Sequence, residues 1–409
     1  MHRRIARRLT YGWLLLAACL PAWADEPAAT PAAETRPSVE QMLPELRLLK
    51  PIWLGTVVHR ESVMFVQDDP TKPATARLLF PATEILAIHS ADGQTTYELG
   101  KDVALSPSGD ELVLLEGATI PRLQVDELFP PVGAPRGIPH KTDDPTRNVL
   151  FAEGHWFHDQ QVEVTYVHAK ADWSGAVPTF ADKQLPRTLA KLKAGEALSL
   201  AVSGDSISAG GNASGATQAP PWMPAFPELV AAQLQQTYGA DVALYNRAVG
   251  GWTTQNGIDD LDALLATKPD LVIIAYGMND VASRNPEAFR QNVAAMLDRI
   301  REANAETEVI LVSPMLGNSQ WVHTPREMFD RYREALASLA GPGVALADVT
   351  SLWESLLKRK REIDLMGNGV NHPNDFGHRT YAQAILAMLV EPTPDGNRQP
   401  NDASSGPPD

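Results

Sequence analysis

The second half of the chain alternates between short apolar runs and longer segments with helical period, and this alternation limits the fold most. Runs such as Leu271–Ala275, which is apolar at every position, are typical of strands buried on both faces of a parallel sheet. We expect strands at 198–202, 242–245, 271–275, 308–312 and 344–347, and helices at 222–238, 257–267, 286–303, 326–339 and 375–389. Residues 193–392 are therefore predicted to form an α/β domain in which helices cover both faces of a parallel sheet.

Residues 45–192 have a different pattern, in which short β-branched and aromatic runs are separated by Gly, Pro and Asp. The clearest run is Gln161–Val167, whose alternation marks a half-buried strand. Further runs lie at 56–58, 63–66, 75–80, 95–97 and 112–115. Many short strands with turn residues between them predict an antiparallel β-sandwich, which would be an accessory domain.

The N-terminus has the features of a secretory signal peptide. Four arginines precede the apolar run Tyr11–Leu20, and Ala22-Trp23-Ala24 has small residues at the cleavage-site positions. We expect residues 1–24 to be removed and the mature protein to be secreted or periplasmic. The run Leu16–Cys19 also fits a lipobox, and in that alternative Cys19 would be lipidated and hold the protein at a membrane.

The composition of the chain excludes some classes of partner and predicts flexible segments near both ends. The formal net charge of -15 argues against nucleic acid or an anionic membrane surface as a partner. Cys19 is the single cysteine, so an internal disulfide and a thiolate zinc site are both excluded. Residues 25–44 are rich in Ala, Pro, Thr and Glu, and 393–409 have no apolar periodicity, so we expect a flexible leader and a disordered tail.

Polar blocks stand where an active site is expected, because the carboxyl ends of the strands carry the chemistry in a parallel α/β sheet. GDS at 204–206 follows the first expected strand, NRAVGG at 246–251 the second, and GMND at 277–280 the third, while HPN at 372–374 precedes the last expected helix. These blocks are predicted to bring Ser206, Gly251, Asn279 and His372 to one edge of the sheet.

The four residues fit acyl transfer through a serine. A serine hydroxyl is a poor nucleophile until a neighbouring imidazole takes its proton, and His372 is the candidate base for Ser206. The tetrahedral oxyanion needs fixed donors, which the N–H of Ser206, the N–H of Gly251 and the side-chain amide of Asn279 could supply. The sequence around Ser206 lacks the GxSxG of α/β-hydrolases, because Ser208 stands where the second glycine would be.

In these four blocks and their order the chain resembles the SGNH (GDSL-type) hydrolase superfamily. The resemblance covers residues 193–392 and implies a flavodoxin-like three-layer α/β fold. It also implies hydrolysis of carboxylic esters through Ser206 and His372, with no metal and no other cofactor. An N-terminal β-sandwich before such a domain is similar to the arrangement in some bacterial carbohydrate acetylesterases.

One position departs from the family pattern. Members of the family usually have an aspartate three residues before the catalytic histidine, where this chain has Gly369. A carboxylate normally orients the imidazole and stabilises the imidazolium. Without it, a backbone carbonyl or Asn368 could hold the tautomer in a Ser–His dyad, which is the first expectation. Asp364 as a third catalytic member is the second expectation, and Asp375 is a further candidate.

The expected function is that of a secreted esterase that removes acetyl or other short acyl groups from a carbohydrate. Trp252 and Met278, which adjoin the motif loops, are the candidates for substrate contact. A lipase or lysophospholipase activity is the alternative among enzymes, and a non-catalytic carbohydrate-binding protein with a degenerate site is the alternative from another class. His155, His158 and His168 are interpreted as structural residues and not as metal ligands.

Overall fold

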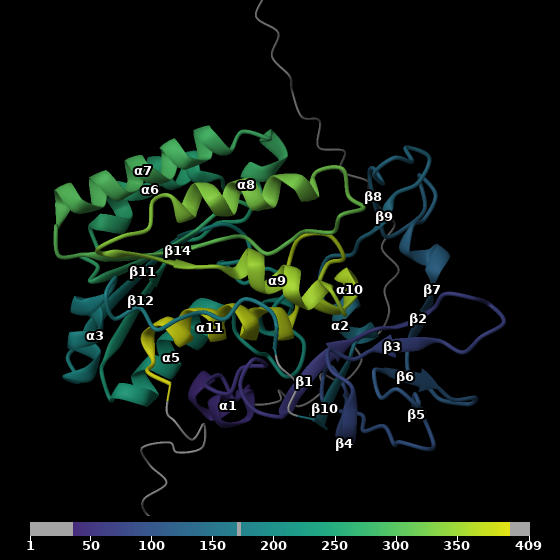
Figure 1. Ribbon diagram of the computed structural model, residues 1–409. Coiled ribbons are helices and arrows are strands. Elements are labelled where there is room, and N and C mark those ends of the chain that lie inside the picture. Colours follow the sequence, from purple (N-terminus) through teal and green to yellow (C-terminus); the bar gives the residue numbers. More distant parts are fainter. Residues whose placement is uncertain (1–35, 170–172, 393–409) are drawn as a thin grey trace, which may run out of the picture. The chain divides into compact units, whose positions relative to one another are not determined.

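The computed structural model describes residues 36–169 and 173–392 (Figure 1). The expected signal peptide at 1–24, the lipidation alternative at Cys19 and the expected tail at 393–409 lie outside the described residues, as does most of the expected leader. Residues 37–169 and 173–392 belong to a single compact unit.

A five-stranded parallel sheet forms the centre of the C-terminal part (Figure 1). Its strands are β11 (Leu198–Gly204), β12 (Val242–Asn246), β13 (Leu271–Ala275), β14 (Glu308–Val312) and β15 (Val344–Ala347). Their spatial order is β12-β11-β13-β14-β15, and every neighbouring pair is parallel. This order confirms the expected α/β fold and its flavodoxin-like arrangement.

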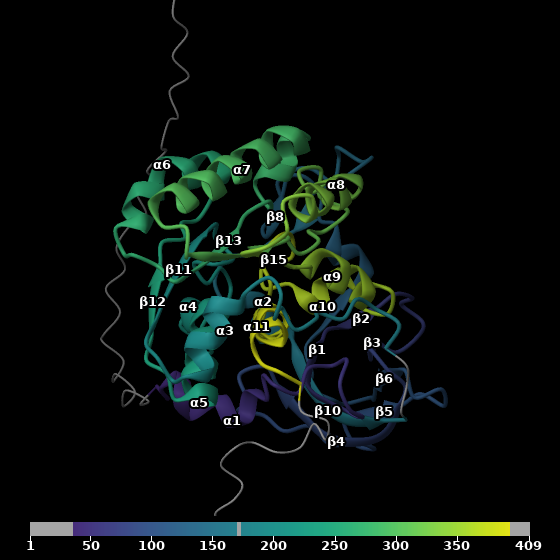
Figure 2. The ribbon, with the colours of Figure 1, turned by 60° about the vertical axis from the view of Figure 1, so that its left-hand side comes forward.

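Helices cover both faces of this sheet (Figure 2). On one face lie α6 (Thr254–Leu265), α7 (Pro286–Ala303) and α8 (Arg326–Ala337), packed side by side. On the other face α5 (Phe226–Tyr238) packs against α11 (Asp375–Leu389) and α3 (Pro186–Lys193). The sequence did not predict α3, α9 (Val349–Leu357) or the short α10 (Glu362–Leu365).

The N-terminal part of the described chain consists of short strands in three further sheets. The first has the order β1-β10-β4, with β1 (Val57–Val63), β10 (Val162–His168) and β4 (Ala82–Ser90) antiparallel. The second has the order β5-β6-β3-β2-β7, with β5 (Val103–Leu105), β6 (Glu111–Leu114), β3 (Thr75–Arg77), β2 (Phe65–Gln67) and β7 (Arg122–Gln124). A two-stranded sheet pairs β8 (Gly137–Ile138) with β9 (Val149–Leu150). The antiparallel expectation holds except for β2 and β7, which run parallel.

The helix α1 (Val39–Leu46) begins inside the range expected to be a flexible leader. Met42, Leu43 and Leu46 are buried, and the helix packs against α5. At its start, the side chain of Gln41 accepts a hydrogen bond from the N–H of Ser38. The burial of three apolar side chains explains why this segment is helical where its Pro- and Ala-rich surroundings suggested a linker.

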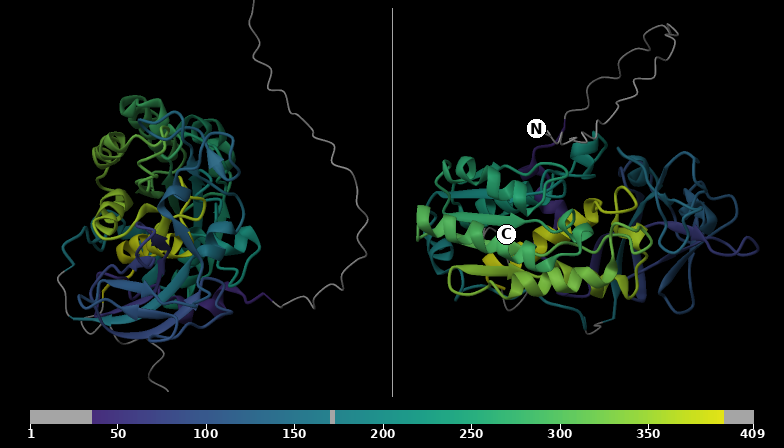
Figure 3. Two further views of the ribbon diagram at one scale, coloured as in Figure 1. Left: turned by 90° about the vertical axis from the view of Figure 1, so that its right-hand side faces the viewer. Right: turned by 90° about the horizontal axis from the view of Figure 1, so that it is seen from above.

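The N-terminal strands pack directly on the helices that follow the central sheet. Strand β1 contacts both α10 and α11, and the yellow C-terminal helix lies against the purple and blue strands in Figure 3. Val164 of β10 and Ile385 of α11 belong to one continuous buried core. The border expected near residue 193 is therefore crossed by the main core.

Among the described helices, none is both long and apolar enough to span a membrane.

Candidate active site

The expected nucleophile and base lie within hydrogen-bond distance of each other. Ser206 stands in the turn that follows β11, and His372 stands in the loop between α10 and α11. The Ser206 hydroxyl is 2.8 Å from Nε2 of His372. Both side chains are half-buried, so a substrate can reach them from solvent.

The other nitrogen of His372 contacts a side chain that the sequence did not suggest. Oδ1 of Asn212 is 2.7 Å from Nδ1 of His372. The amide nitrogen of Asn212 donates to the carbonyls of Gly154 and Gly367, each at 3.0 Å. Because these two acceptors use both amide hydrogens, the oxygen must face His372. Nδ1 therefore carries the proton, and Nε2 is free to accept the proton of Ser206.

The residues expected to orient His372 have other partners. The carboxylate of Asp364 accepts hydrogen bonds from the backbone N–H groups of Met64 and Arg361, both at 2.8 Å. Oδ1 of Asn368 accepts from three backbone N–H groups of its own loop, at 370, 371 and 372. Asn368 thus holds the loop that carries His372 and not its imidazole. The side chain of Asp375 accepts from the N–H of Ser214. In the structure the side chain beside Nδ1 of His372 is therefore the amide of Asn212, and not that of Asp364, Asn368 or Asp375.

Packing explains why position 369 is a glycine. Gly369 has a φ of +87°, in the region that favours glycine. A Cβ there would collide with the carbonyl oxygen of Leu150 and with the ring of Phe157. Both come from the N-terminal part of the chain, which occupies the space that a side chain at this position would need. A carboxylate cannot be placed there, and the amide of Asn212 reaches the imidazole from another direction.

Gly211 and Gly250 bring backbone close to the Ser206–His372 pair. A Cβ on Gly211 would lie 2.9 Å from Nδ1 of His372, so only a glycine lets the imidazole pack against this backbone. Gly251 has a φ of +79° and is exposed beside Gly250, whose Cβ would lie 3.8 Å from that of Ser206. The turn is held along β11, because the N–H of Val249 donates to the carbonyl of Gly204.

Asn279 lies beside the same turn. Its side-chain amide donates to the carbonyl of Trp252 at 2.8 Å. Asn279 follows β13, whose last residue, Ala275, pairs with Gly204 of β11. Ser206, the 250–252 turn and Asn279 therefore gather at the carboxyl ends of three neighbouring strands, as expected from the sequence.

A buried carboxyl links two of these turns. Asp205 accepts hydrogen bonds from the N–H of Ile207, at 3.0 Å, and from the N–H of Met278. Burial raises the pKa of Asp205 to about 7, and the nearby charge of Asp280 adds to this. Asp280 accepts hydrogen bonds from the N–H and hydroxyl of Thr254 at the start of α6. Asp205 thus fixes the turn of Ser206 against the turn of Asn279.

Burial also shifts the protonation of the candidate base. It lowers the pKa of His372 to about 4, and His378 acts in the same direction. His378 is fully buried, and its Nε2 lies 3.0 Å from the carbonyl of Gly211. At neutral pH the imidazole of His372 is uncharged, which is the state that a general base requires.

The two expected substrate contacts have different surroundings. Met278 is only 3% exposed and belongs to the main core, so its side chain is not available to a substrate. Trp252 is half-buried and packs at the edge of that core, with part of its surface open.

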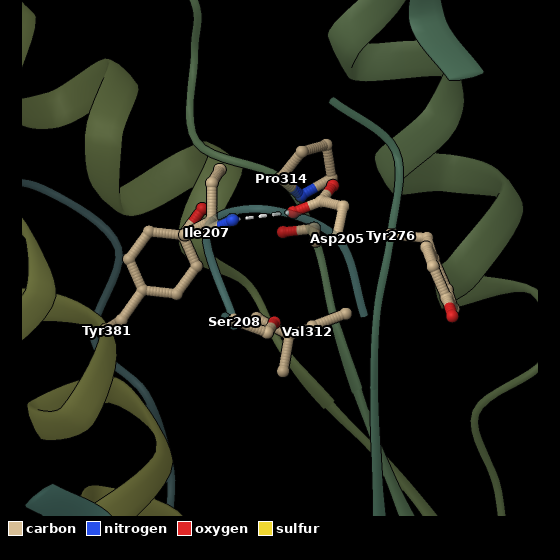
Figure 4. Close-up of a pocket in the computed structure, with 9 residues that line it drawn as sticks. Asp205, Ile207, Ser208, Tyr276, Val312, Pro314 and Tyr381 are labelled. Carbon is tan, nitrogen blue, oxygen red and sulfur yellow. Dashed lines mark hydrogen bonds between the residues drawn. The ribbon is translucent and has the colours of Figure 1, made fainter. Parts of the chain in front are cut away.

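A small cavity lies behind the nucleophile turn (Figure 4). Asp205, Ile207, Pro314 and Tyr381 are among the side chains around it, and it has space for about one water molecule. Ser206 and His372 do not line it. This cavity is therefore a packing gap beneath the site and not the place where an ester would bind.

The histidines that were interpreted as structural, His155, His158 and His168, each contact another group of the protein. His155 pairs with Asp159 at 2.8 Å, and His158 contacts the carbonyl of Pro220 at 2.7 Å. His168 contacts the carbonyl of Ala169 at 2.7 Å. Within residues 36–169 and 173–392, no group of three or more His, Cys, Asp or Glu residues is arranged to hold a metal ion.

Comparison with known proteins assigns the same region to one family. The model of the GDSL-like lipase/acylhydrolase family matches residues 202–380. Esterase TesA of Pseudomonas aeruginosa is 32% identical over 158 residues, which are 38% of this chain and 69% of TesA. An arylesterase of Vibrio mimicus is 32% identical over 115 residues, which are 28% of this chain and 54% of that protein.

The solved structures that match include a two-domain esterase described as active on acetylated mannans. It is 24% identical, with a TM-score of 0.41, and the alignment covers 53% of this chain. This chain spans about half of that structure, 54% of its length.

Proposed function

Because the chain belongs to the GDSL-like lipase/acylhydrolase family, and is thus a carboxylic ester hydrolase, we propose that Ser206 is its nucleophile and His372 its general base. The observation that carries this proposal is the unbroken chain of contacts from Ser206 through His372 to Asn212. Nucleophile, base and orienting group stand in the order that activates a serine hydroxyl.

In the first half of the reaction Nε2 of His372 takes the proton of the Ser206 hydroxyl as Oγ attacks the ester carbonyl carbon. The negative charge that develops on the carbonyl oxygen is stabilised by the N–H groups of Ser206 and Gly251 and by the second amide hydrogen of Asn279. The tetrahedral intermediate then collapses, and His372 gives its proton to the oxygen of the departing alcohol. The product of this half is an acyl group on Ser206.

In the second half a water molecule takes the place of the alcohol. His372 accepts a proton from the water as its oxygen attacks the acyl carbon. Collapse of this intermediate returns the proton to Oγ of Ser206 and releases the carboxylic acid. Asn212 keeps Nδ1 protonated throughout, and its oxygen accepts a stronger hydrogen bond when the imidazole becomes positively charged.

The proposed substrates are short-chain acyl esters, in the first place acetyl esters, on a carbohydrate. Gly250 and Gly251 are exposed, so an ester on a bulky, polar alcohol can approach Ser206. The half-exposed ring of Trp252 adjoins this turn and offers an aromatic face of the kind that sugar rings stack on.

A chain-length series of p-nitrophenyl esters, from acetate to palmitate, tests the acyl group. Release of acetate from a panel of acetylated polysaccharides tests the alcohol. We expect kcat/KM to fall with chain length, acetate to be released, and both activities to be lost in Ser206→Ala. Ser199→Ala, at the opposite end of β11, is the matched control and should retain them.

Three results would contradict parts of the proposal. A preference for long acyl chains would indicate a lipase-type enzyme. Binding of polysaccharide without cleavage of any ester would indicate a carbohydrate-binding protein. Full activity in Ser206→Ala would refute the assignment of the nucleophile.

We also propose that the mature protein is secreted or periplasmic, on the strength of the sequence of residues 1–24. Mass spectrometry of the mature N-terminus separates the two forms of this proposal. A chain that begins at Asp25 supports cleavage after Ala24, whereas a lipid-modified Cys19 supports membrane anchoring.

A further inference from the structure

The loop that carries His372 is held by polar side chains from the N-terminal strands. Counted with the last residues of α10, it runs from Ile363 to Asn374, and residues 366–374 lie outside any helix or strand. Its stem is closed where the N–H of Asn374 donates to the carbonyl of Leu365 at 3.0 Å. Nearer the tip, the N–H of Gly367 donates to the carbonyl of His372 at 2.9 Å. The stem of this loop therefore sets where the imidazole stands.

Gln161 forms hydrogen bonds with both ends of that loop. Its side chain is 2% exposed, and its amide nitrogen donates to the carbonyls of Ile363, at 3.0 Å, and Met366, at 2.8 Å. Its amide oxygen accepts a hydrogen bond from the side chain of Asn374 at 3.1 Å. Both hydrogens and the oxygen of this amide are thus used on the one loop.

Asn374 extends this contact into helix α11. Its oxygen accepts a hydrogen bond from the N–H of Gly377 at 3.0 Å, which caps the start of the helix. Its nitrogen also lies 2.9 Å from the hydroxyl of Ser62 on β1 and from the carbonyl of Asp364. Gln161, Ser62, the loop stem and α11 form one buried network.

A buried ion pair fastens the segment before the loop. Nζ of Lys360 is 2.6 Å from Oε1 of Glu61 on β1, and both side chains are fully buried. The hydroxyl of Tyr166 on β10 donates to the other oxygen of Glu61 at 2.6 Å. The carboxylate of Asp364 accepts a hydrogen bond from the N–H of Met64. Loss of one partner of a buried ion pair leaves an uncompensated charge and is strongly destabilising, so this pair ties the segment before the loop to β1.

We infer that the N-terminal β region is part of the catalytic apparatus, and that Gln161 is a positioning residue that sets the place of His372 against Ser206. This inference rests on the proposed catalytic roles of Ser206 and His372. An accessory binding domain would contact the hydrolase through its surface. Here a buried glutamine just before β10 instead supplies hydrogen bonds that the catalytic loop lacks within its own segment.

Replacement of Gln161 by leucine tests the inference, because leucine has a similar volume and no hydrogen-bonding group. Two carbonyls and Asn374 would lose a partner, and the stem would relax. Misplacement of a catalytic group by about 1 Å costs on the order of 10²-fold in rate. We expect kcat on p-nitrophenyl acetate to fall about 10- to 100-fold in Gln161→Leu, with KM within two-fold of the native value.

The matched control is Gln233→Leu. Gln233 is 3% exposed on α5 and donates to Gln236 and Thr237, away from the catalytic loop. It should lose thermal stability as Gln161→Leu does but keep its kcat per folded molecule. A loss of kcat in Gln161→Leu alone supports positioning. Equal kcat in the two variants, with folding confirmed by circular dichroism, would overturn the inference.

Two further variants, Ser62→Ala and Ser206→Ala, test the inference if Gln161→Leu does not fold and separate it from the proposed function. If Gln161→Leu does not fold, Ser62→Ala removes a single contact of Asn374, and we expect a two- to five-fold lower kcat at native KM. A native kcat in folded Ser62→Ala would then count against the inference. Ser206→Ala in the same assay separates the two proposals. If it is inactive while Gln161→Leu is native-like, the positioning role alone fails; if it is active, both fail.

Discussion

Replacement of Asn212 by leucine probes the contact that takes the place of the family's carboxylate. Leucine has nearly the same shape and lacks the oxygen that faces Nδ1 of His372 at 2.7 Å. It also lacks the nitrogen that donates to the carbonyls of Gly154 and Gly367. The imidazole would lose the partner that fixes its tautomer, and two buried carbonyls would lose a donor.

The magnitude follows from the charge state of His372 during the reaction. In the transition state the imidazole holds two protons, so its Nδ1–H is a charged donor. A hydrogen bond to a charged group contributes about 1.5–3 kcal/mol. Since about 1.4 kcal/mol corresponds to a factor of ten in rate, kcat should fall roughly 10- to 150-fold. KM should change little, because Asn212 lies behind the imidazole.

The assay is steady-state hydrolysis of p-nitrophenyl acetate, with the thermal midpoint measured in parallel. The two unpaired carbonyls should each lower the free energy of unfolding by about 1–3 kcal/mol. Asn148→Leu, which removes another buried amide, is the control and should keep its kcat. A folded Asn212→Leu variant with kcat within three-fold of the native value would refute the reasoning.

Three further predictions concern the donors, the base and the loop. Asn279→Ala should lower kcat about 10²- to 10³-fold at similar KM, since it removes one oxyanion donor; a loss under five-fold would contradict that role. The acid limb of kcat/KM should lie near pH 4, because burial lowers the pKa of His372 to that value; a limb near pH 6.5 would contradict it. By the same shift the native state binds fewer protons than the unfolded chain between pH 4 and 6.5, so the contribution of His372 to the free energy of unfolding should rise with pH across this window. Gly369→Ala should lower the free energy of unfolding by about 1–3 kcal/mol, because the new Cβ would overpack against Leu150 and Phe157. The positive φ at this position should lower the free energy of unfolding further. Urea titration measures the change, and an unchanged urea midpoint would contradict the prediction.

The sequence predicted the central sheet closely because its strands are short apolar runs, of which Leu271–Ala275 is buried at every position. The strand 308–312 and the helix 286–303 were placed with the bounds of β14 and α7. The helix expected from residue 222 begins only at Phe226, which places Pro227 in its first turn, where a proline is tolerated; a start at 222 would put Pro227 in the interior, where it lacks the N–H that a helix needs. The helix α9 was missed, although Asp348, whose side chain accepts a hydrogen bond from the N–H of Ser351, is a typical residue for a helix start.

Ser206 and His372 were found from the sequence because they belong to local blocks at predictable places in a parallel sheet. Asn212 was not, because its role depends on the carbonyls of Gly154 and Gly367, which lie 58 and 155 residues away in the chain. The two glycines before it were the available signal, since consecutive glycines allow close approach of backbone to a side chain.

Asp364 was the second expectation for the group that orients His372, because it is a carboxylate eight residues before it in the sequence. In the fold its carboxylate faces away, toward the N–H of Met64 and the ammonium of Lys360, which lies 3.7 Å from it. These partners come together through the packing of β1 on α10, which no local pattern in the sequence shows.

The central claim is that Ser206 carries the acyl group between the two halves of the reaction. Acid quenching of the enzyme during turnover of p-nitrophenyl acetate, followed by proteolysis and mass spectrometry, measures this directly. The account predicts the mass of one acetyl group on the peptide that contains Ser206, and no such peptide in Ser206→Ala. An acetyl group on another residue, or turnover with unmodified Ser206 that persists in Ser206→Ala, would contradict it.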